Sequence, residues 1–329
     1  MHKISIIGLG QIGASIGLGL RKKIKGVEIV GHDIEPTTAG KARKIGAVDK
    51  ISYSLPNSLE GASIVIVCVP VEAVKQVFDE IAPSLEEGTI VTDTSSTKIQ
   101  VMQWADEILP NNVDFVGGHP MAGVETPGIE GAEQGLFEGA AYGIFPTVNV
   151  RPESVDAVVS LVNLLDAQPL FIDPVEHDSL VAGVSHLPIA LSITLMNATA
   201  QSASWREMSR LAAGSFRDVS RLSSGSVDMH HSIFSTNRDS VLRWLDSFDI
   251  QLKQFRAAVE EGGDDLRELI ESAYQSRSDW LSGKIKGDND SIQNVPTASE
   301  NMLGMLGGDK LAELSRKFDK DSKNGPPGR

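Results

Sequence analysis

The chain has 329 residues, of which 44 are acidic and 30 are basic, so its formal net charge at pH 7 is −14. A chain of this length usually divides into more than one domain, because single hydrophobic cores stop growing at about 250–300 residues. The negative charge argues against a general nucleic-acid-binding surface or an anionic membrane surface, so neither partner is expected. Local arginines must therefore attract any anionic substrate.

Cysteine is nearly absent from the chain. The one cysteine, Cys68, lies inside the apolar run 64–69, which predicts a small buried side chain and excludes an internal disulfide framework. The first apolar run is interrupted by Gly8, and no apolar stretch reaches the roughly 20 residues of a membrane-spanning helix. We therefore expect a soluble cytoplasmic protein without a signal peptide.

The chain begins with a strand, a glycine-rich loop and a helix. The apolar run 4–7 is followed by Gly8-Leu-Gly-Gln-Ile-Gly13 and then by an apolar stretch of helical character up to Leu20. Gly8 permits a tight turn, Gly10 allows the backbone to approach a pyrophosphate, and Gly13 lets the helix pack close to the strand. The strand before the loop and the helix after it predict a dinucleotide-binding βαβ unit.

A second predicted strand, residues 28–33, ends in Asp33, twenty residues after Gly13. A carboxylate at this position accepts hydrogen bonds from both ribose hydroxyls and repels a 2′-phosphate. The following Ile34-Glu-Pro offers no basic side chain to offset that repulsion, so the expected cofactor is NAD rather than NADP. The residues assigned to its binding are Gly8, Gly10, Gln11, Ile12, Gly13, Asp33, Val69 and Pro70.

Up to about residue 150, short apolar runs alternate with helical patterns, as a parallel sheet covered on both faces requires. The predicted strands are residues 3–8, 28–33, 64–69, 89–93, 114–118, 142–147 and 169–172. The predicted helices between them are residues 36–45, 71–81, 100–109 and 154–165, and Ser95 or Ser96 is expected to cap the third. These elements predict an α/β, doubly wound Rossmann domain over residues 1–173.

Strand signals fade after residue 173, and the pattern becomes helical. Apolar residues recur at spacings of three and four up to residue 280, for example at Leu252, Phe255 and Val259. This predicts an all-α second domain over residues 174–280, whose apolar faces either form a homodimer interface or are buried within one chain. Residues 281–329 are polar and rich in turn formers, typical of a flexible tail, with one amphipathic helix expected at 303–318.

Two polar segments follow predicted strands, at the edge where ligands bind in open α/β sheets. They are Asp93-Thr-Ser-Ser-Thr-Lys98 and Gly117-Gly-His-Pro-Met-Ala-Gly123. Removal of hydride from a carbinol carbon needs a base for the hydroxyl proton, so His119 is the predicted catalytic base, with a buried structural histidine as the alternative. The rate is expected to fall at low pH, with an apparent pKa of about 6.5 for His119. Ser96 either caps a helix or faces the substrate beside His119.

Five ordered segments of the chain resemble the prephenate and arogenate dehydrogenases of tyrosine biosynthesis. They are Gly8-Leu-Gly-Gln-Ile-Gly13, Asp93-Thr-Ser-Ser-Thr-Lys98, Gly118-His-Pro-Met-Ala-Gly123, Ser185-His-Leu-Pro188 and Gly214-Ser-Phe-Arg-Asp-Val-Ser-Arg221, and the similarity extends from residue 1 to about residue 280. The resemblance implies an NAD-dependent oxidative decarboxylation. Hydride leaves C4 of a cyclohexadienol ring, and the ring carboxylate departs as CO₂.

The resemblance also implies roles for individual side chains. His119 matches the family's catalytic histidine, and Ser96 matches the serine that assists it. Arg221 matches the arginine that binds the substrate carboxylate, a role suited to a planar fork of donors. His186 and Gly214 are the other predicted substrate-binding residues, with organisation of a helix start as the alternative role for His186.

Several alternatives remain open. Many members of the family carry a histidine where this chain has Ile189 and a tryptophan where it has His230, which leaves both prephenate and arogenate as substrates. A 3-hydroxy-acid dehydrogenase of the same two-domain type would carry a catalytic lysine in the helical domain, and a non-enzymatic NAD-binding module would show no turnover. His177 and Asp178 are interpreted as a local pair. No metal site is expected, because the adjacent histidines 230 and 231 project in different directions from a helix.

Overall fold

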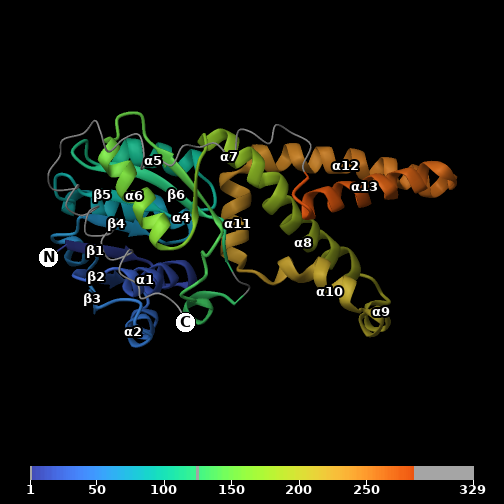
Figure 1. Ribbon diagram of the computed structural model, residues 1–329. Coiled ribbons are helices and arrows are strands. Elements are labelled where there is room, and N and C mark those ends of the chain that lie inside the picture. The colour runs from blue at the N-terminus through green and yellow to red at the C-terminus, as the bar shows by residue number, and fades with distance from the viewer. Residues whose placement is uncertain (1, 124–125, 285–329) are drawn as a thin grey trace, which may run out of the picture. The chain divides into compact units, whose positions relative to one another are not determined.

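The computed structural model describes residues 2–123 and 126–284. The chain forms two compact units, one up to Phe248 and one from Asp249 onward. The first unit contains a sheet, the helices that cover it and a further set of helices (Figure 1). The second contains the C-terminal half of α12 (Arg238–Glu261) and α13 (Asp264–Leu281). The domain boundary expected at residue 173 stays a prediction.

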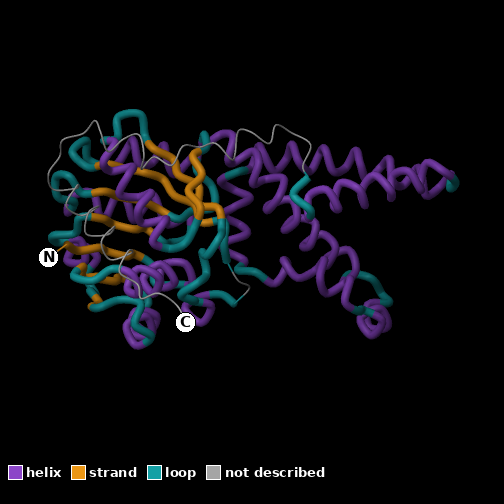
Figure 2. Tube along the Cα trace, in the orientation of Figure 1, coloured by secondary structure: helices purple, strands orange, loops and turns teal. Residues whose placement is uncertain are grey.

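The first unit is built on an eight-stranded sheet. In order across the sheet, its strands are β3 (Lys50–Ile51), β2 (Val27–His32), β1 (His2–Ile7), β4 (Ile64–Val67), β5 (Ile90–Asp93), β6 (Asp114–Pro120), β7 (Ala141–Pro146) and β8 (Gln168–Phe171). Strands β1 to β6 run parallel to one another, whereas β7 is antiparallel to β6 and parallel to β8. Helices flank these strands in Figure 2.

The doubly wound Rossmann sheet predicted from the sequence is confirmed, but two details differ. The short strand β3 was not predicted, and β7 and β8 run against the other strands. The reversal has a topological reason. A parallel neighbour needs a crossover, usually an α-helix, whereas the described residues between β6 and β7 contain only the short 3₁₀ turn η2 (Gly128–Gly131). The chain therefore returns on the same edge and pairs antiparallel.

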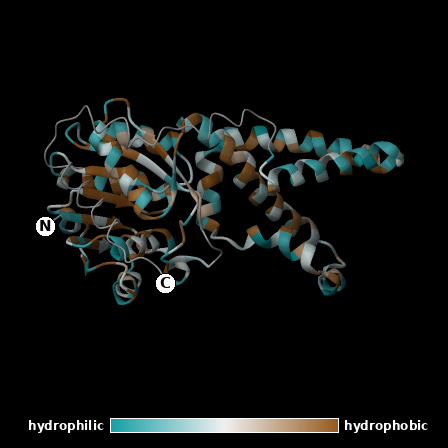
Figure 3. Cartoon of the chain, viewed as in Figure 1, coloured by the Kyte–Doolittle hydropathy of each residue, from teal (hydrophilic) through white to brown (hydrophobic). Residues whose placement is uncertain are grey.

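Six helices belong to the sheet layers: α1 (Gln11–Lys23), α2 (Pro36–Lys44), α3 (Leu55–Leu59), α4 (Val71–Ile81), α5 (Ile99–Ile108) and α6 (Pro152–Leu164). Neighbouring residues of a strand point to opposite faces. Accordingly Ile6 belongs to a core with residues of α1, α2 and α6, and Ile7 belongs to a second core with residues of α3, α4 and α5. Hydrophobic colouring follows the strands in Figure 3. Burial on both faces explains why the strands are continuously apolar rather than alternating.

The helices after the sheet are α7 (Pro174–Val181), α8 (Leu187–Ala200), α9 (Trp205–Leu211), α10 (Gly214–Ser220), α11 (Val227–Thr236), α12 and α13. The all-helical character predicted after residue 173 is confirmed for the described residues. The expected helix at 303–318 and most of the expected tail lie outside the described residues.

A π-helical turn, η3 (Ala182–His186), joins α7 to α8, so that residues 174–200 form one helical run. By length and composition this run is apolar enough to cross a membrane, with a mean hydropathy of 1.7 over its most apolar window. The expectation that no segment reaches that length was wrong, because α7, η3 and α8 are continuous. Its buried polar residues His177, Asp178 and His186 form hydrogen bonds to β6, to the start of α5 and to Asn237.

Candidate active site

The glycine loop after β1 has the shape predicted for a dinucleotide site. Gly8 has φ +88°, and a Cβ there would stand 2.4 Å from the Cys68 carbonyl oxygen. A Cβ on Gly13 would stand 2.0 Å from the Gly8 carbonyl oxygen, whereas one on Gly10 would meet no protein atom within 4 Å. The α1 helix has no side-chain cap at its N-terminus. The open space at Gly10, beside the N-terminus of α1, fits a pyrophosphate.

Asp33 joins the end of β2 to this loop. Its Oδ2 accepts a hydrogen bond from Leu9 N at 2.7 Å, and its Oδ1 accepts one from Glu35 N at 2.9 Å. An ionised carboxylate has about four acceptor positions, so two backbone donors leave capacity for ribose hydroxyls. The half-buried carboxylate therefore lies in the place that a ribose-binding acid requires.

The remaining predicted cofactor residues surround the same loop. Gln11 Nε2 donates to the Thr126 carbonyl at 2.8 Å, which links α1 to the segment after β6, and Ile12 is half-buried beside it. Val69 and Pro70 follow β4, next to β1 in the sheet, and a Cβ on Gly8 would stand 3.1 Å from Val69 Cγ1. The parallel pairing of β1 and β4 brings their carboxyl ends together, as predicted.

His119 lies near the end of β6, at this same edge of the sheet. A buried ion pair binds the backbone of Gly118, the residue directly before His119. Lys98 Nζ donates to Asp93 Oδ2 at 2.5 Å and to the Gly118 carbonyl at 2.6 Å, while Gly118 N donates to Asp93 Oδ1 at 3.0 Å. The side chains of Lys98 and Asp93 are both 0% exposed. Lys98 therefore anchors the β6 backbone that carries the imidazole.

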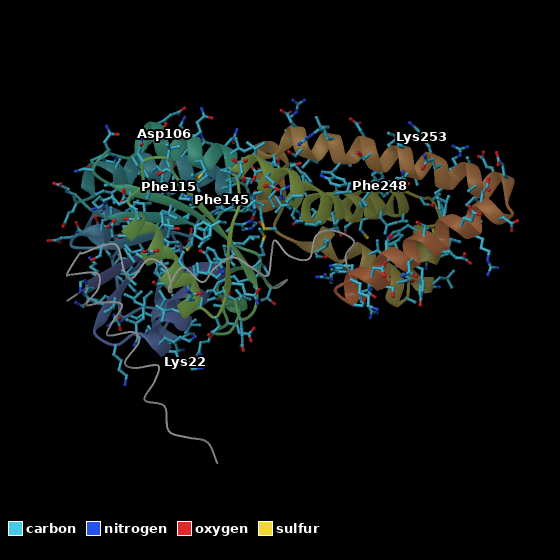
Figure 4. All side chains as sticks on the ribbon, turned by 45° about the horizontal axis from the view of Figure 1, so that its top comes forward. Lys22, Asp106, Phe115, Phe145, Phe248 and Lys253 are labelled. Carbon is cyan, nitrogen blue, oxygen red and sulfur yellow. The ribbon has the colours of Figure 1, made fainter. Side chains whose placement is uncertain are left out.

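The His119 ring contacts a second histidine, which in turn contacts a carboxylate. His119 Nδ1 lies 2.8 Å from His177 Nε2, and His177 Nδ1 lies 2.8 Å from Asp178 Oδ1. Phe145, labelled in Figure 4, packs edge-to-face against His177 with ring centroids 4.9 Å apart. His177 and Asp178 are almost fully buried. Their adjacency in the sequence indicates only a local pair.

Asp178 also caps helix α5. Its carboxylate accepts from Lys98 N at 2.8 Å and from Ile99 N at 3.0 Å. The expectation that Ser95 or Ser96 caps this helix was wrong, because the helix begins at Ile99 and its end is capped by a side chain 79 residues away. A cap from so distant a residue leaves no local sequence signal.

The surroundings of His119 keep its imidazole neutral. Desolvation of the imidazole lowers its pKa well below the usual value, and the neighbouring His177, Lys98 and His186 lower the pKa further. The pKa of about 6.5 expected from the sequence was therefore too high. A neutral imidazole is the form that accepts a proton, so His119 is available as a base throughout the neutral range.

The other predicted site residues differ in how far they are buried. Ser96 is half-buried in the loop between β5 and α5, and within the described residues no hydrogen bond joins its hydroxyl to His119. His186 is buried, with Nδ1 3.3 Å from Asn237 Nδ2, and burial lowers its pKa to about 4. The Asn237 amide also donates to the Asp178 carbonyl at 2.6 Å, a contact that the sequence analysis missed.

Arg221 lies in the 3₁₀ turn η4 (Arg221–Ser224) and is exposed. It lines a cavity of about 450 Å³ together with Arg217, Trp205 and Phe216. His119, Ser96 and His186 are not among the lining residues of this cavity. Gly214, the first residue of α10, is exposed. The substrate-binding roles of Arg221, His186 and Gly214 stay predictions.

Most of the chain is similar to known proteins. Residues 16–170 match the family described as "Prephenate dehydrogenase, nucleotide-binding domain", and residues 173–272 match "Prephenate dehydrogenase, dimerization domain". The chain is 34% identical over 287 residues to the prephenate dehydrogenase of Bacillus subtilis, covering 86% of this chain and 77% of that protein.

Solved structures give the same result. The arogenate dehydrogenase of Synechocystis is 30% identical and superposes with a TM-score of 0.71, covering 84% of this chain and 99% of that one. The prephenate dehydrogenase of A. aeolicus, solved with hydroxyphenyl propionate and NAD⁺, is 26% identical with a TM-score of 0.80, covering 85% and 98%. The two domains of the family match this chain in consecutive segments, residues 16–170 and 173–272. The chain therefore belongs to the prephenate dehydrogenase family.

Proposed function

We propose that this chain is an NAD-dependent prephenate dehydrogenase, which converts prephenate to 4-hydroxyphenylpyruvate and CO₂. The observation that carries the proposal is the position of His119, whose imidazole lies 2.8 Å from the buried His177 at the sheet edge that also carries the dinucleotide loop. The 34% identity to the Bacillus subtilis enzyme supports the substrate class.

The cofactor assignment rests on the fit of the loop. NAD⁺ bound at Gly8, Gly10, Gln11, Ile12, Gly13, Asp33, Val69 and Pro70 supplies the acceptor for the hydride from C4 of the substrate. Gly10 leaves room for a pyrophosphate, and Asp33 presents a carboxylate with acceptor capacity toward the ribose. A 2′-phosphate would meet that carboxylate, which favours NAD over NADP.

His119 accepts the proton of the substrate's 4-hydroxyl and later returns it. Its neutral Nε2 takes that proton as hydride leaves C4, which produces a 4-oxo ring with the carboxylate still attached. Loss of CO₂ sends the bonding electron pair through the ring to the oxygen, and His119 returns the proton to form the phenol. The sum is prephenate dianion plus NAD⁺ giving 4-hydroxyphenylpyruvate anion, CO₂ and NADH.

Other side chains are assigned to substrate binding. Arg221 provides a guanidinium for a substrate carboxylate, and the presence of Arg217 in the same cavity supports an anionic ligand there. His186 and Gly214 are proposed to line the substrate side, and Ser96 is proposed to assist His119 from the loop after β5. The described structure supports Ser96 through its half-buried position at the edge that carries His119.

Arogenate dehydrogenase activity is the second candidate. The 30% identity to the Synechocystis arogenate dehydrogenase favours it, as does similarity to the cyclohexadienyl dehydrogenase of Zymomonas mobilis, 27% identical over 83% of this chain. The match to a dimerization domain at residues 173–272 supports a homodimer through the helices. A cytoplasmic location is proposed because the relatives act in biosynthesis.

The test is direct. Purified protein is mixed with NAD⁺ and either prephenate or arogenate, and formation of NADH is followed by absorbance. We expect turnover with prephenate, and His119→Asn should bind NAD⁺ but lose turnover. Absence of NADH formation with prephenate would contradict the proposal. Turnover with arogenate alone would select the second candidate.

A further inference from the structure

The imidazole of His119 is one end of a buried row of three groups. His119 comes from β6, while His177 and Asp178 are neighbours on α7. The two contacts in the row are both 2.8 Å, and the second involves a carboxylate that is 0% exposed. Within the described residues, His119 Nε2 takes part in no hydrogen bond, so this nitrogen is the one available to a ligand.

Asp178, at the other end of the row from His119, determines which ring nitrogens of the two histidines carry hydrogen. Asp178 accepts from the backbone N–H groups of Lys98 and Ile99, which is the behaviour of an ionised carboxylate. An ionised carboxylate cannot donate, so His177 Nδ1 carries the hydrogen of their bond. A His177 ring that carries only this hydrogen has a bare Nε2, which accepts from His119 Nδ1 at 2.8 Å. The lone pair of neutral His119 is consequently on Nε2.

We infer that His177 and Asp178 are positioning residues that select the tautomer of His119 and so make its Nε2 the proton acceptor. The inference rests on the proposed role of His119 as the base. When His119 becomes cationic by taking the substrate's hydroxyl proton, its Nδ1–H remains bonded to His177, whose Nδ1–H remains bonded to Asp178. No further proton has to move. The buried carboxylate stabilises the cation through the intervening imidazole, as the aspartate of a catalytic triad does.

Other charged and titratable groups face this row. Lys98 and Asp93 lie beneath β6 as an ion pair, and His186 faces it from η3. Burial and the nearby Lys98 ammonium disfavour a proton on His119, so the base is neutral before reaction. Asp178 is the group in the row with the opposite charge. Its two backbone donors hold it in place, so its orientation does not depend on the substrate.

Asp178→Asn should exchange the ring nitrogens of His177 and His119 that carry hydrogen, while it keeps the size of the side chain at position 178. Asp178 Oδ2 accepts from Ile99 N at 3.0 Å and from Lys98 N at 3.1 Å, whereas Oδ1 lies 2.8 Å from both Lys98 N and His177 Nδ1. An amide oxygen in the place of Oδ2 keeps both backbone donors, and the amide nitrogen in the place of Oδ1 then donates to His177 Nδ1. His177 then carries its hydrogen on Nε2 and donates it to His119 Nδ1, which places the His119 hydrogen on Nε2. Turnover should fall on the order of 10²–10⁴-fold, because that nitrogen can no longer accept a proton. NAD⁺ affinity should not change.

Asp173→Asn is the matched control. Asp173 is an exposed carboxylate on the same helix that also accepts from two backbone N–H groups, those of Val175 and Glu176. Among the described residues its side chain has no hydrogen bond to the row, and its backbone carbonyl, which accepts from His177 N at 2.8 Å, is unchanged by the substitution, so the turnover of Asp173→Asn should equal that of the wild type. His177→Gln and His177→Leu form a second pair: the glutamine carbonyl still accepts from His119 Nδ1 and should retain most turnover, whereas leucine should lose it.

The decisive measurement combines turnover with ¹⁵N NMR of labelled histidine rings, assigned by His119→Asn. Wild type should show a His119 Nε2 without hydrogen, and Asp178→Asn should show one with hydrogen. If Asp178→Asn keeps both the wild-type tautomer and the turnover of Asp173→Asn, while His119→Asn is inactive, the inference fails and the base assignment stands. If the tautomer switches without loss of turnover, His119 is not the base and the proposed function of that residue fails. Leucine and glutamine at position 177 behaving alike would also overturn the inference.

Discussion

Replacing Lys98 with methionine removes the cation of the buried pair beneath His119 and keeps most of the side-chain volume. Asp93 would keep its backbone donors, Ser95 N at 2.9 Å and Gly118 N at 3.0 Å, but would lose its only ion-pair partner among the described residues. A buried charge without a partner costs about 3–5 kcal/mol. Lys98→Met should therefore lower the free energy of unfolding by about that amount.

The loss should depend on the charge of Asp93. In the double variant Lys98→Met/Asp93→Asn, the uncompensated charge is gone, so most of the stability should return. Lys41→Met is the control, because Lys41 and its partner Glu130 are each 57% exposed and their pair should contribute little. Denaturant unfolding followed by circular dichroism measures all three.

Function gives a second readout for the same variants. Lys98 Nζ also donates to the Gly118 carbonyl, the residue directly before His119. Turnover of Lys98→Met should fall more than its NAD⁺ affinity, since the glycine loop makes no contact with Nζ in the described structure. A single variant as stable as wild type, or a double variant no more stable than the single one, would refute the argument from a buried uncompensated charge.

Three further outcomes are expected. Asp33→Ala should weaken NAD⁺ binding more than NADP⁺ binding, and a wild type that uses NADP⁺ at least as efficiently as NAD⁺ would contradict the ribose assignment. Arg221→Ala should raise KM for prephenate by about tenfold or more with unchanged NAD⁺ affinity; an unchanged KM would make Arg221 structural. Because the pKa of His119 is lowered and only its neutral form accepts a proton, kcat/KM should stay level as pH falls to 6.5 and decline only at lower pH. A decline centred at 6.5 or above would contradict the buried environment, as would an acid limb unchanged in His119→Asn.

Much of the first unit follows from local patterns in the sequence. The glycine loop was recognised from a strand, three glycines and a helix within the first 20 residues, and its conformation agrees: Gly8 has positive φ, and Gly13 has no room for a Cβ. Helix α4 was predicted at residues 71–81 and has those bounds. Its buried residues Val71, Val74 and Phe78 recur at helical spacing. Such features need only neighbours along the chain.

The direction of β7 and the cap of α5 could not be predicted from local sequence patterns. A strand's apolar pattern is the same whether it pairs parallel or antiparallel, so the pattern of residues 142–147 could not show that the chain turns back along β6. For α5, Ser95 and Ser96 are good local caps, but Asp178 from α7 takes the backbone donors. The electrostatic gain of a buried carboxylate on those donors outweighs a local hydroxyl.

The sequence by itself determined the two kinds of architecture, the dinucleotide loop and the identity of His119 as the titratable group at the sheet edge, because periodicity and motif spacing are properties of contiguous residues. Only the tertiary structure decided the state of that histidine. Its pKa depends on burial and on His177, which is 58 residues away, and on Lys98 and His186. Its tautomer depends on Asp178. Desolvation and Coulomb interactions act through space, so the chemistry of His119 is set by groups that no spacing along the chain connects to it.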